Sequence, residues 1–213
     1  MSTATTTPAV RPASGLKAKH IFWIVMGLAG LSVLWSSEYP ILIHPNDPYT
    51  RKVIADRLLL IPHAVAGVLA TVLGPFQFST RFRQRHLALH RLMGKTYIIA
   101  IFVAAPMALV LGLRGFSFPM RFMGMLQPVA WFVCTLAAFI TARNRQIAVH
   151  RQWMVRSYAF TLNFIFSRFL NFLPSYFNMS ETGLAMTLAL LSVSYFLIPD
   201  LAFNWRELTH RRA

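Results

Sequence analysis

The run LLLIPHAVAGVLATVLGPFQF, residues 58–78, decides the fold class, because its 21 residues include no Asp, Glu, Lys or Arg. A helix needs about 20 mostly apolar residues to cross the hydrocarbon core of a bilayer. Strands of a membrane barrel would be about half that length and would alternate in polarity. The run therefore predicts a membrane-spanning helix.

Five further apolar runs lie around it, at residues 21–35, 97–113, 122–142, 157–174 and 183–199. The run 157–174 is the least apolar of them, because it carries Arg168 and two asparagines. Together the runs predict an all-α fold, a polytopic six-helix transmembrane bundle over residues 20–208. The Ser-, Thr- and Pro-rich residues 1–19 are expected to form a disordered tail, and residues 209–213 a short basic C-terminal end.

The basic residues predict the orientation of these helices. With the N-terminus in the cytoplasm, fifteen of the 21 Lys and Arg residues fall in the tail, the inner loops and the C-terminus, and five fall in the outer loops. This asymmetry matches the positive-inside rule. We therefore expect both termini to be cytoplasmic, in a multi-pass protein of the inner (plasma) membrane. The inner basic residues are expected to contact anionic lipid headgroups.

The composition excludes several other classes of protein. The net charge is +15, but the basic residues alternate with long uncharged blocks and do not line one exposed face, which argues against a nucleic-acid partner. Cys134 is the only cysteine. The chain therefore has no intrachain disulfide, no cysteine-based zinc site and no covalent haem attachment through paired cysteines. It also lacks a glycine-rich phosphate loop and a nucleophile elbow.

Two similar phrases open the predicted third and fifth helices. They are LHRLMGKTY, residues 89–97, and VHRQWMVRSY, residues 149–158. Because these helices run in the same direction, His90 and His150 should lie at the same depth. One interpretation is interfacial anchoring, since Arg, Lys and Tyr are enriched at membrane surfaces. The other is a shared site at which both histidines bind a ligand, a metal or a proton.

His63 lies about 8 Å inside the outer boundary of the second helix, at 1.5 Å per residue. An ionisable residue at that depth indicates a functional site. One helix face reads His63, Gly67, Ala70, Gly74, Gln77. This stripe of small residues is typical of close helix packing, and it also suits a flat cofactor laid against it with His63 as a ligand. The neighbouring proline at position 62 frees a carbonyl one turn back, which is expected to fix the His63 tautomer.

The segments LIPHAVAGVLATVLGPFQF, LHRLMGKTY and VHRQWMVRSYAF resemble DUF2306, a family of predicted bacterial membrane proteins. The likeness covers most of the chain apart from the tail and implies a polytopic membrane fold. A looser likeness is to b-type cytochromes and ferric-reductase-type membrane domains, which hold haem between helices through histidine pairs. The sequence departs from their two-haem pattern, because His63 has no histidine partner within a helix.

The first functional hypothesis is electron transfer through haem b. His90 and His150 would be the ligands of the metal, and Gly94 would relieve crowding beside His90. Arg91 and Arg151 would pair with the haem propionates. His63 and the face of Gly67 would serve a second cofactor or a quinone, and a separate redox partner is expected.

Two alternatives remain open. A carrier of protons or small molecules, or an accessory subunit without chemistry, would use the same polar residues, so the sequence does not decide whether the protein is an enzyme. A membrane metal-dependent hydrolase would use His86, His90, His150 and Asp200 to bind zinc. Against the hydrolase, the surrounding arginines repel a divalent cation, and no His-Glu-x-x-His motif supplies a general base.

Overall fold

The computed structural model describes residues 54–114, 117–170 and 179–209, together with isolated positions between residues 24 and 51. This part of the chain contains helices and no strand, which confirms the predicted all-α class. The helices are α4 (Arg57–Phe78), α5 (Thr80–Arg85), α6 (Leu87–Leu113), α7 (Phe118–Arg143), α8 (Ile147–Thr161), α9 (Asn163–Phe169) and α11 (Glu181–Thr209).

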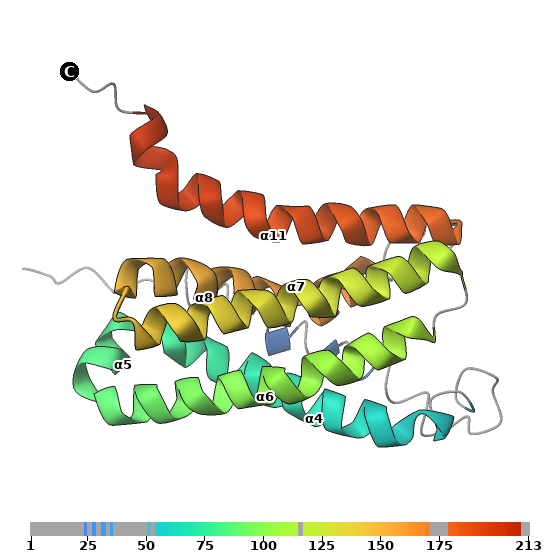
Figure 1. Ribbon diagram of the computed structural model, residues 1–213, viewed down its shortest axis with the longest axis horizontal. Coiled ribbons are helices and arrows are strands. Elements are labelled where there is room, and N and C mark those ends of the chain that lie inside the picture. Colours follow the sequence, from blue (N-terminus) through green and yellow to red (C-terminus); the bar gives the residue numbers. More distant parts are fainter. Residues whose placement is uncertain are drawn as a thin grey trace, which may run out of the picture.

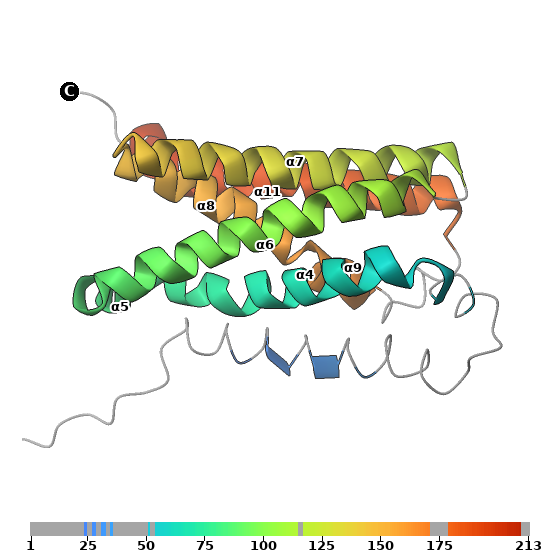
Figure 2. The same ribbon diagram turned by 60° about the horizontal axis from the view of Figure 1, so that its bottom comes forward.

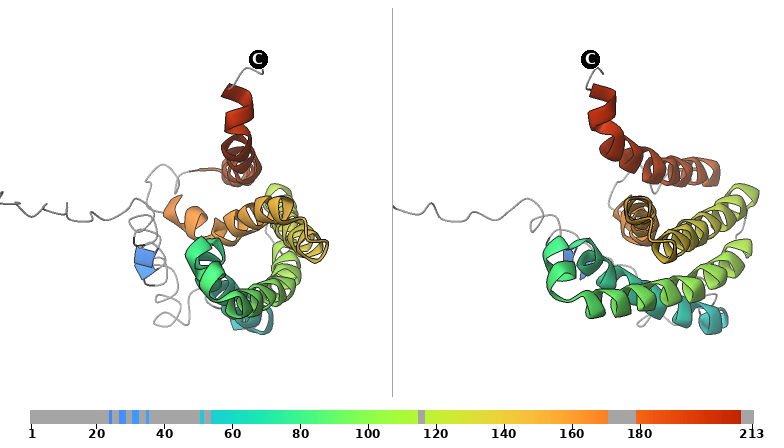
Figure 3. Two further views of the ribbon diagram at one scale, coloured as in Figure 1. Left: turned by 90° about the vertical axis from the view of Figure 1, so that its left-hand side faces the viewer. Right: turned by 60° about the vertical axis from the view of Figure 1, so that its left-hand side comes forward.

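Four helices surround a common axis (Figures 1 and 3). Each packs against two others, in the order α4, α6, α7, α8 and back to α4. α6 and α8, which carry the two His-Arg phrases, are therefore diagonal to each other across the bundle. Figure 2 shows α4 running beside α6. α11 lies outside this group, against α7 and α8.

Four of the described helices are long and apolar enough to cross a membrane, namely Arg57–Phe78, Leu87–Leu113, Phe118–Arg143 and Glu181–Trp205. They correspond to the runs predicted at 58–78, 97–113, 122–142 and 183–199. The tail 1–19 and most of the run 21–35 lie outside the described residues. The number of six spans and the side on which each terminus lies remain predictions.

The run 157–174 is divided between two helices, neither of which is a full span by itself. α8 begins at Ile147, ten residues before the predicted start, and ends at Thr161. The backbone bonds Leu162 N–Tyr158 O and Phe166 N–Leu162 O, both 3.0 Å, carry the helical pattern on into α9. The polar phrase is helical because its side chains pack inside the bundle, where Met154, Ser157 and Tyr158 are buried. Residues 171–174 lie outside the described residues.

Basic residues gather at one end of the bundle, which we call the basic end (left in Figure 1). It comprises α5, the first turns of α6, the last turn of α7 and the first turns of α8. Its basic residues are Arg81, Arg83, Arg85, Arg91, Lys95, Arg143, Arg145, Arg151 and Arg156. At the opposite end, Asp56 before α4 forms an ion pair with Arg114 after α6.

A tight turn at the basic end folds α8 back along α7. The Gln146 N–H donates to Thr141 O at 2.9 Å, and the Arg145 N–H donates to Ala142 O at 3.1 Å. These are the two bonds of a Schellman motif, with Arg145 in the left-handed region at φ 59°. The turn places His150 one turn into α8, facing the last turns of α7.

Glycines permit two close approaches between helices. A Cβ at Gly112 would lie 2.1 Å from the carbonyl oxygen of Gly124, so α6 and α7 touch through their backbones near the end opposite the basic end. A Cβ at Gly74 would lie 1.9 Å from the ring of Tyr158. The small-residue stripe of α4 is therefore a packing surface at Gly74, where the Tyr158 ring of α8 covers it.

Candidate functional site

His150 is held in one orientation by the backbone of α7. Its Nδ1 lies 2.8 Å from the carbonyl oxygen of Ala138. A carbonyl only accepts, so Nδ1 must carry the proton and donate it. In the neutral ring this leaves the lone pair on Nε2, the atom through which a fixed histidine binds a metal or accepts a proton.

His90 lies across the bundle from His150 and within its electrostatic range. The charges that act on His90 are those of Arg83, His150 and Arg91. The His90 Nδ1 is buried and has no hydrogen-bond partner among the described residues. His90 and His150 thus lie at the same end of the bundle, with His150 among the charges that act on His90, and one nitrogen of the His90 ring is unsatisfied.

Gln77, near the C-terminal end of α4, contributes a second unsatisfied atom. Its side chain is only 8% exposed, and its Nε2 has no partner within the described part of the chain. The Gln77 Oε1 lies 3.2 Å from the point where a Cβ of Gly94 would stand. Gly94 is one turn after His90 on the same face of α6. We call Gln77, His90, Gly94 and His150 the paired-histidine site.

The two arginines that follow the histidines have different surroundings. Arg91 is exposed and acts electrostatically on His90. Arg151 is also exposed, and its guanidinium carbon lies 5.9 Å from the centre of the Phe203 ring on α11. In this conformation Arg151 is engaged with α11, and Arg83 of α5 is the further arginine that reaches His90.

His63 forms a separate position on α4, anchored to α6. Its Nδ1 lies 2.9 Å from the carbonyl oxygen of Ala104, which makes Nδ1 the donor and leaves Nε2 free. The tautomer is therefore fixed by a carbonyl of the neighbouring helix, and the expectation that the carbonyl freed by Pro62 would fix it was wrong. A Cβ at Gly67 would meet nothing within 4 Å, so this glycine packs against no described neighbour.

A buried cluster of hydroxyl groups joins α6, α7 and α8. The Tyr97 hydroxyl lies 2.9 Å from both Ser157 Oγ and Thr161 Oγ1. Thr135 Oγ1 lies 2.7 Å from Ser157 Oγ, and the Trp131 indole N–H donates to Thr161 Oγ1 at 3.0 Å. Tyr97, Thr135 and Ser157 are each 0% exposed. The sequence pattern carries no signal for the pairing of Tyr97 with Ser157 and Thr161, which lie 60 and 64 positions away in the chain.

Replacing Tyr97 by phenylalanine is expected to lower the free energy of unfolding by about 1–2 kcal/mol, because it removes a fully buried hydroxyl that bridges two helices. The loss stays in this range because Ser157 and Thr161 keep Thr135 and Trp131 as partners. Chemical unfolding in detergent micelles measures it. Tyr195→Phe is the comparison and should lose less, since Tyr195 donates one part-buried bond, to Asn163 Oδ1 at 2.9 Å. The reverse order would contradict the prediction.

A second polar cluster links α7, α9 and α11. The Gln127 Nε2 donates to Ser192 Oγ at 3.0 Å, while Asn163 Nδ2 donates to Gln127 Oε1 at 3.2 Å. The Tyr195 hydroxyl donates to Asn163 Oδ1. Both amide groups of Gln127 and Asn163 are thus hydrogen-bonded within the cluster, which makes it a structural link between helices. No hydrogen bond in it involves His63.

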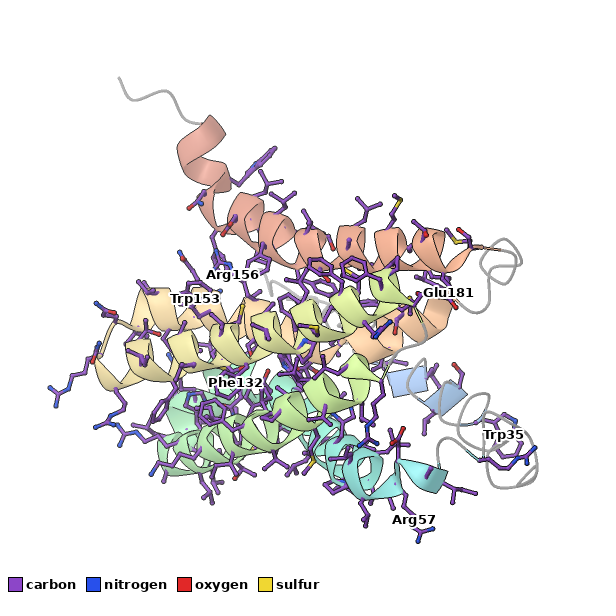
Figure 4. The ribbon with its side chains drawn as sticks, turned by 45° about the vertical axis from the view of Figure 1, so that its right-hand side comes forward. Trp35, Arg57, Phe132, Trp153, Arg156 and Glu181 are labelled. Atoms are coloured by element: carbon purple, nitrogen blue, oxygen red, sulfur yellow. The ribbon has the colours of Figure 1, made fainter. Side chains whose placement is uncertain are left out.

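The zinc site of the hydrolase hypothesis is not assembled. No three His, Cys, Asp or Glu side chains in the described ranges lie close enough together to hold a metal ion. Asp200 forms an ion pair with Arg156, whose guanidinium carbon lies 5.0 Å from the centre of the Trp153 ring (Figure 4). His86 lies at the junction of α5 and α6, with its ring 5.6 Å from that of Phe82.

A hollow of about 200 Å³ lies between α6 and α7. It is lined by apolar residues alone, including two helix-interior prolines: Ala105, Pro106, Leu109, Pro128, Val129 and Phe132. It offers no side chain that could bind iron or form a hydrogen bond. The chemistry-bearing side chains lie at the paired-histidine site and at His63.

The sequence profile of DUF2306, described as predicted membrane proteins, matches residues 60–204. This match covers α4 to α11 and includes both His-Arg phrases. Comparison with curated proteins and with solved structures gave no match. The match over more than half of the chain shows that the protein belongs to the DUF2306 family of membrane proteins.

Proposed function

We propose that this member of the DUF2306 family is a membrane electron-transfer protein that holds haem b between His90 and His150. The observation that supports it best is the pairing of the two histidines across the bundle. They come from diagonal helices and lie at the same end of the bundle, and His150 is among the charges that act on His90. Two imidazoles from neighbouring parts of a bundle would be a ligand set for haem iron.

The chain's own groups fit this role at several points. The carbonyl of Ala138 holds the His150 ring with Nε2 as the free nitrogen, which is the usual support for a metal-binding histidine. Gly94 keeps a side chain away from the face of α6 that carries His90. Arg83 and Arg91 supply positive charge beside His90, where haem propionates would need it. When bound, the haem would supply reversible one-electron chemistry.

We further propose that the basic end faces the cytoplasm of a cell whose inner membrane holds the protein. The excess of Lys and Arg at this end supports that orientation. In it, the arginines of α5 contact anionic lipid headgroups, and the paired-histidine site lies just beneath them.

The decisive experiment is the reduced-minus-oxidised absorption spectrum of the protein, purified in detergent after expression with added haem precursor. We expect the bands of a six-coordinate b-type haem in the wild-type protein, and their loss in His90→Ala and in His150→Ala. His86→Ala is the matched control and should keep the bands, because His86 is exposed at the α5–α6 junction. A wild-type protein without haem bands, or equal loss in His86→Ala, would overturn the proposal.

A proton carrier is the second candidate, and the hydroxyl cluster favours it. Thr135, Ser157, Tyr97 and Thr161 form a hydrogen-bonded series in the core, about two to three turns beyond the histidines along α6 and α8. Such a protein would move protons into sealed vesicles along a pH gradient, which the haem proposal does not require. If vesicles take up protons while the protein in them shows no haem bands, proton transport replaces electron transfer as the proposed function.

A further inference from the structure

Two buried polar atoms without partners lie on facing sides of α4 and α6. They are Nε2 of Gln77 and Nδ1 of His90. A buried polar group is normally hydrogen-bonded to another group of the protein, because burial removes its hydrogen bonds to water and an unpaired group gains none in exchange. The third such atom among the described residues, Ser117 Oγ, lies beyond the other end of α6, before α7. Only the first two therefore share one location.

Gly94 relates the positions of the two side chains that carry these atoms. Gly94 follows His90 by one turn, so the two residues project from the same face of α6. The amide of Gln77 lies against this face, with Oε1 3.2 Å and Cδ 3.9 Å from the position of a Gly94 Cβ. Gly94 thus lets the amide sit next to the α6 backbone, one helical turn from the residue that carries the His90 ring. The side chain of Gln77 is more than nine-tenths buried there.

The chemistry of these atoms defines the group that would satisfy them. Nε2 of an amide is a donor, and Nδ1 of a neutral histidine is also a donor when the ring carries its proton on that nitrogen. A ligand that binds both donors must offer a hydrogen-bond acceptor, such as a carbonyl oxygen. The positive charges of Arg83 and Arg91 near His90 favour the same partner.

Two aromatic residues flank Gln77 in the sequence, and aromatic neighbours favour a flat ligand. Phe78, next to Gln77 in sequence, lies 5.4 Å from Tyr158 between ring centres. Phe76, on its other side, lies 5.9 Å from Phe82 of α5. Aromatic side chains stack on conjugated rings. Phe76 is 46% exposed, so one aromatic ring of this turn lies on the outside of the bundle.

We propose that Gln77 and His90 bind the carbonyl oxygen of a quinone headgroup drawn from the membrane, with the amide N–H and the ring Nδ1–H as the two donors. The binding site stands on the two unpaired atoms alone. The role of this site in electron transfer rests on the proposed function. The inference adds to that function by naming a quinone as the redox partner. A quinone is the fitting class because it combines a flat ring, a carbonyl acceptor and solubility in the bilayer.

The experiment is a binding titration of the full chain in lipid nanodiscs with a decyl-substituted benzoquinone, measured by quenching of tryptophan fluorescence and corrected against empty nanodiscs. We expect saturable binding by the wild type and a Kd about tenfold weaker for Gln77→Leu, the loss expected for one hydrogen bond to the ligand. Gln84→Leu on exposed α5 is the matched control and should bind like the wild type. Gly94→Ala, which pushes the Gln77 amide by a few tenths of an ångström, should also weaken binding.

Helicity and haem absorption of each variant are measured in parallel. Haem bands in a protein that binds no quinone, or binding by Gln77→Leu and Gly94→Ala equal to that of the wild type, would overturn the quinone site and leave the haem proposal standing. Quinone binding that depends on Gln77 in a protein without haem bands would overturn the haem proposal and leave the quinone site standing. An ordered water as the sole occupant would give no saturable binding, which also refutes the site.

Discussion

Gly112→Ala is expected to destabilise the protein by about 3 kcal/mol, the upper part of the range for overpacked sites. The added Cβ would lie 2.1 Å from the carbonyl oxygen of Gly124, which is backbone and has no rotamer that relieves the overlap. α6 and α7 would have to separate along the end of the bundle opposite the basic end. Thermal or chemical unfolding in detergent, followed by tryptophan fluorescence, measures the loss.

Gly67→Ala is the matched control, because a Cβ at Gly67 would meet nothing within 4 Å. Alanine has the higher helix propensity, so this variant should be neutral or more stable by up to about 1 kcal/mol. Both changes add one methyl group to the middle or end of an apolar helix. Equal stability of the two variants would show that the contact between Gly112 and Gly124 is not close.

Asp200→Ala is expected to cost about 2–3 kcal/mol, because it leaves the guanidinium of Arg156 in the bundle without its counter-charge. Breaking a buried ion pair costs about 3–5 kcal/mol. The lower figure applies because the Asp200 side chain is 46% exposed, so water screens the pair. The Arg156 side chain, at 11% exposed, and the neighbouring Trp153 ring limit that access. Chemical unfolding of the variant in detergent measures the loss.

Two further variants separate the charge from the packing. The double variant Arg156→Met, Asp200→Leu should recover most of the loss, since similar apolar volume replaces both ions. Asp56→Ala should cost less than about 1 kcal/mol, because its partner Arg114 is half exposed at the bundle's end. A double variant as unstable as Asp200→Ala would contradict this account.

The apolar runs predicted where helices cross the bilayer, but not where they begin. The run at 58–78 is α4 to within one residue. α6 and α8 begin ten residues before their apolar runs, at Leu87 and Ile147, because the polar phrases that precede the runs are also helical. Hydropathy indicates whether a segment lies in lipid, and it does not show where a helix begins. The two polar phrases are helical because their side chains can face the bundle or the membrane interface.

The candidate site could be predicted in part. The repeat pointed to His90 and His150, and in the structure both lie at the basic end, on helices diagonal to each other; a shared ligand between them is still a proposal. Gln77 stood at the end of the glycine stripe without an assigned role, because only its position against Gly94 shows that its amide lacks a partner. The predicted role of Gly67 as a cofactor face is still a proposal, as is a second ligand at His63.

By itself the sequence determined that this is a membrane protein. The bilayer requires long uncharged helices, and each segment must meet that requirement separately. The sequence also determined that two histidines recur at equivalent places in parallel helices. Only the tertiary structure decided the partners: Ala138 for His150, Ala104 for His63, and the hydroxyl cluster around Tyr97. Most of these contacts join residues tens of positions apart in the chain, and they follow from how the helices are rotated and how closely they approach. Glycines and backbone carbonyl groups determine how closely the helices approach, and the hydropathy of the sequence does not predict that distance.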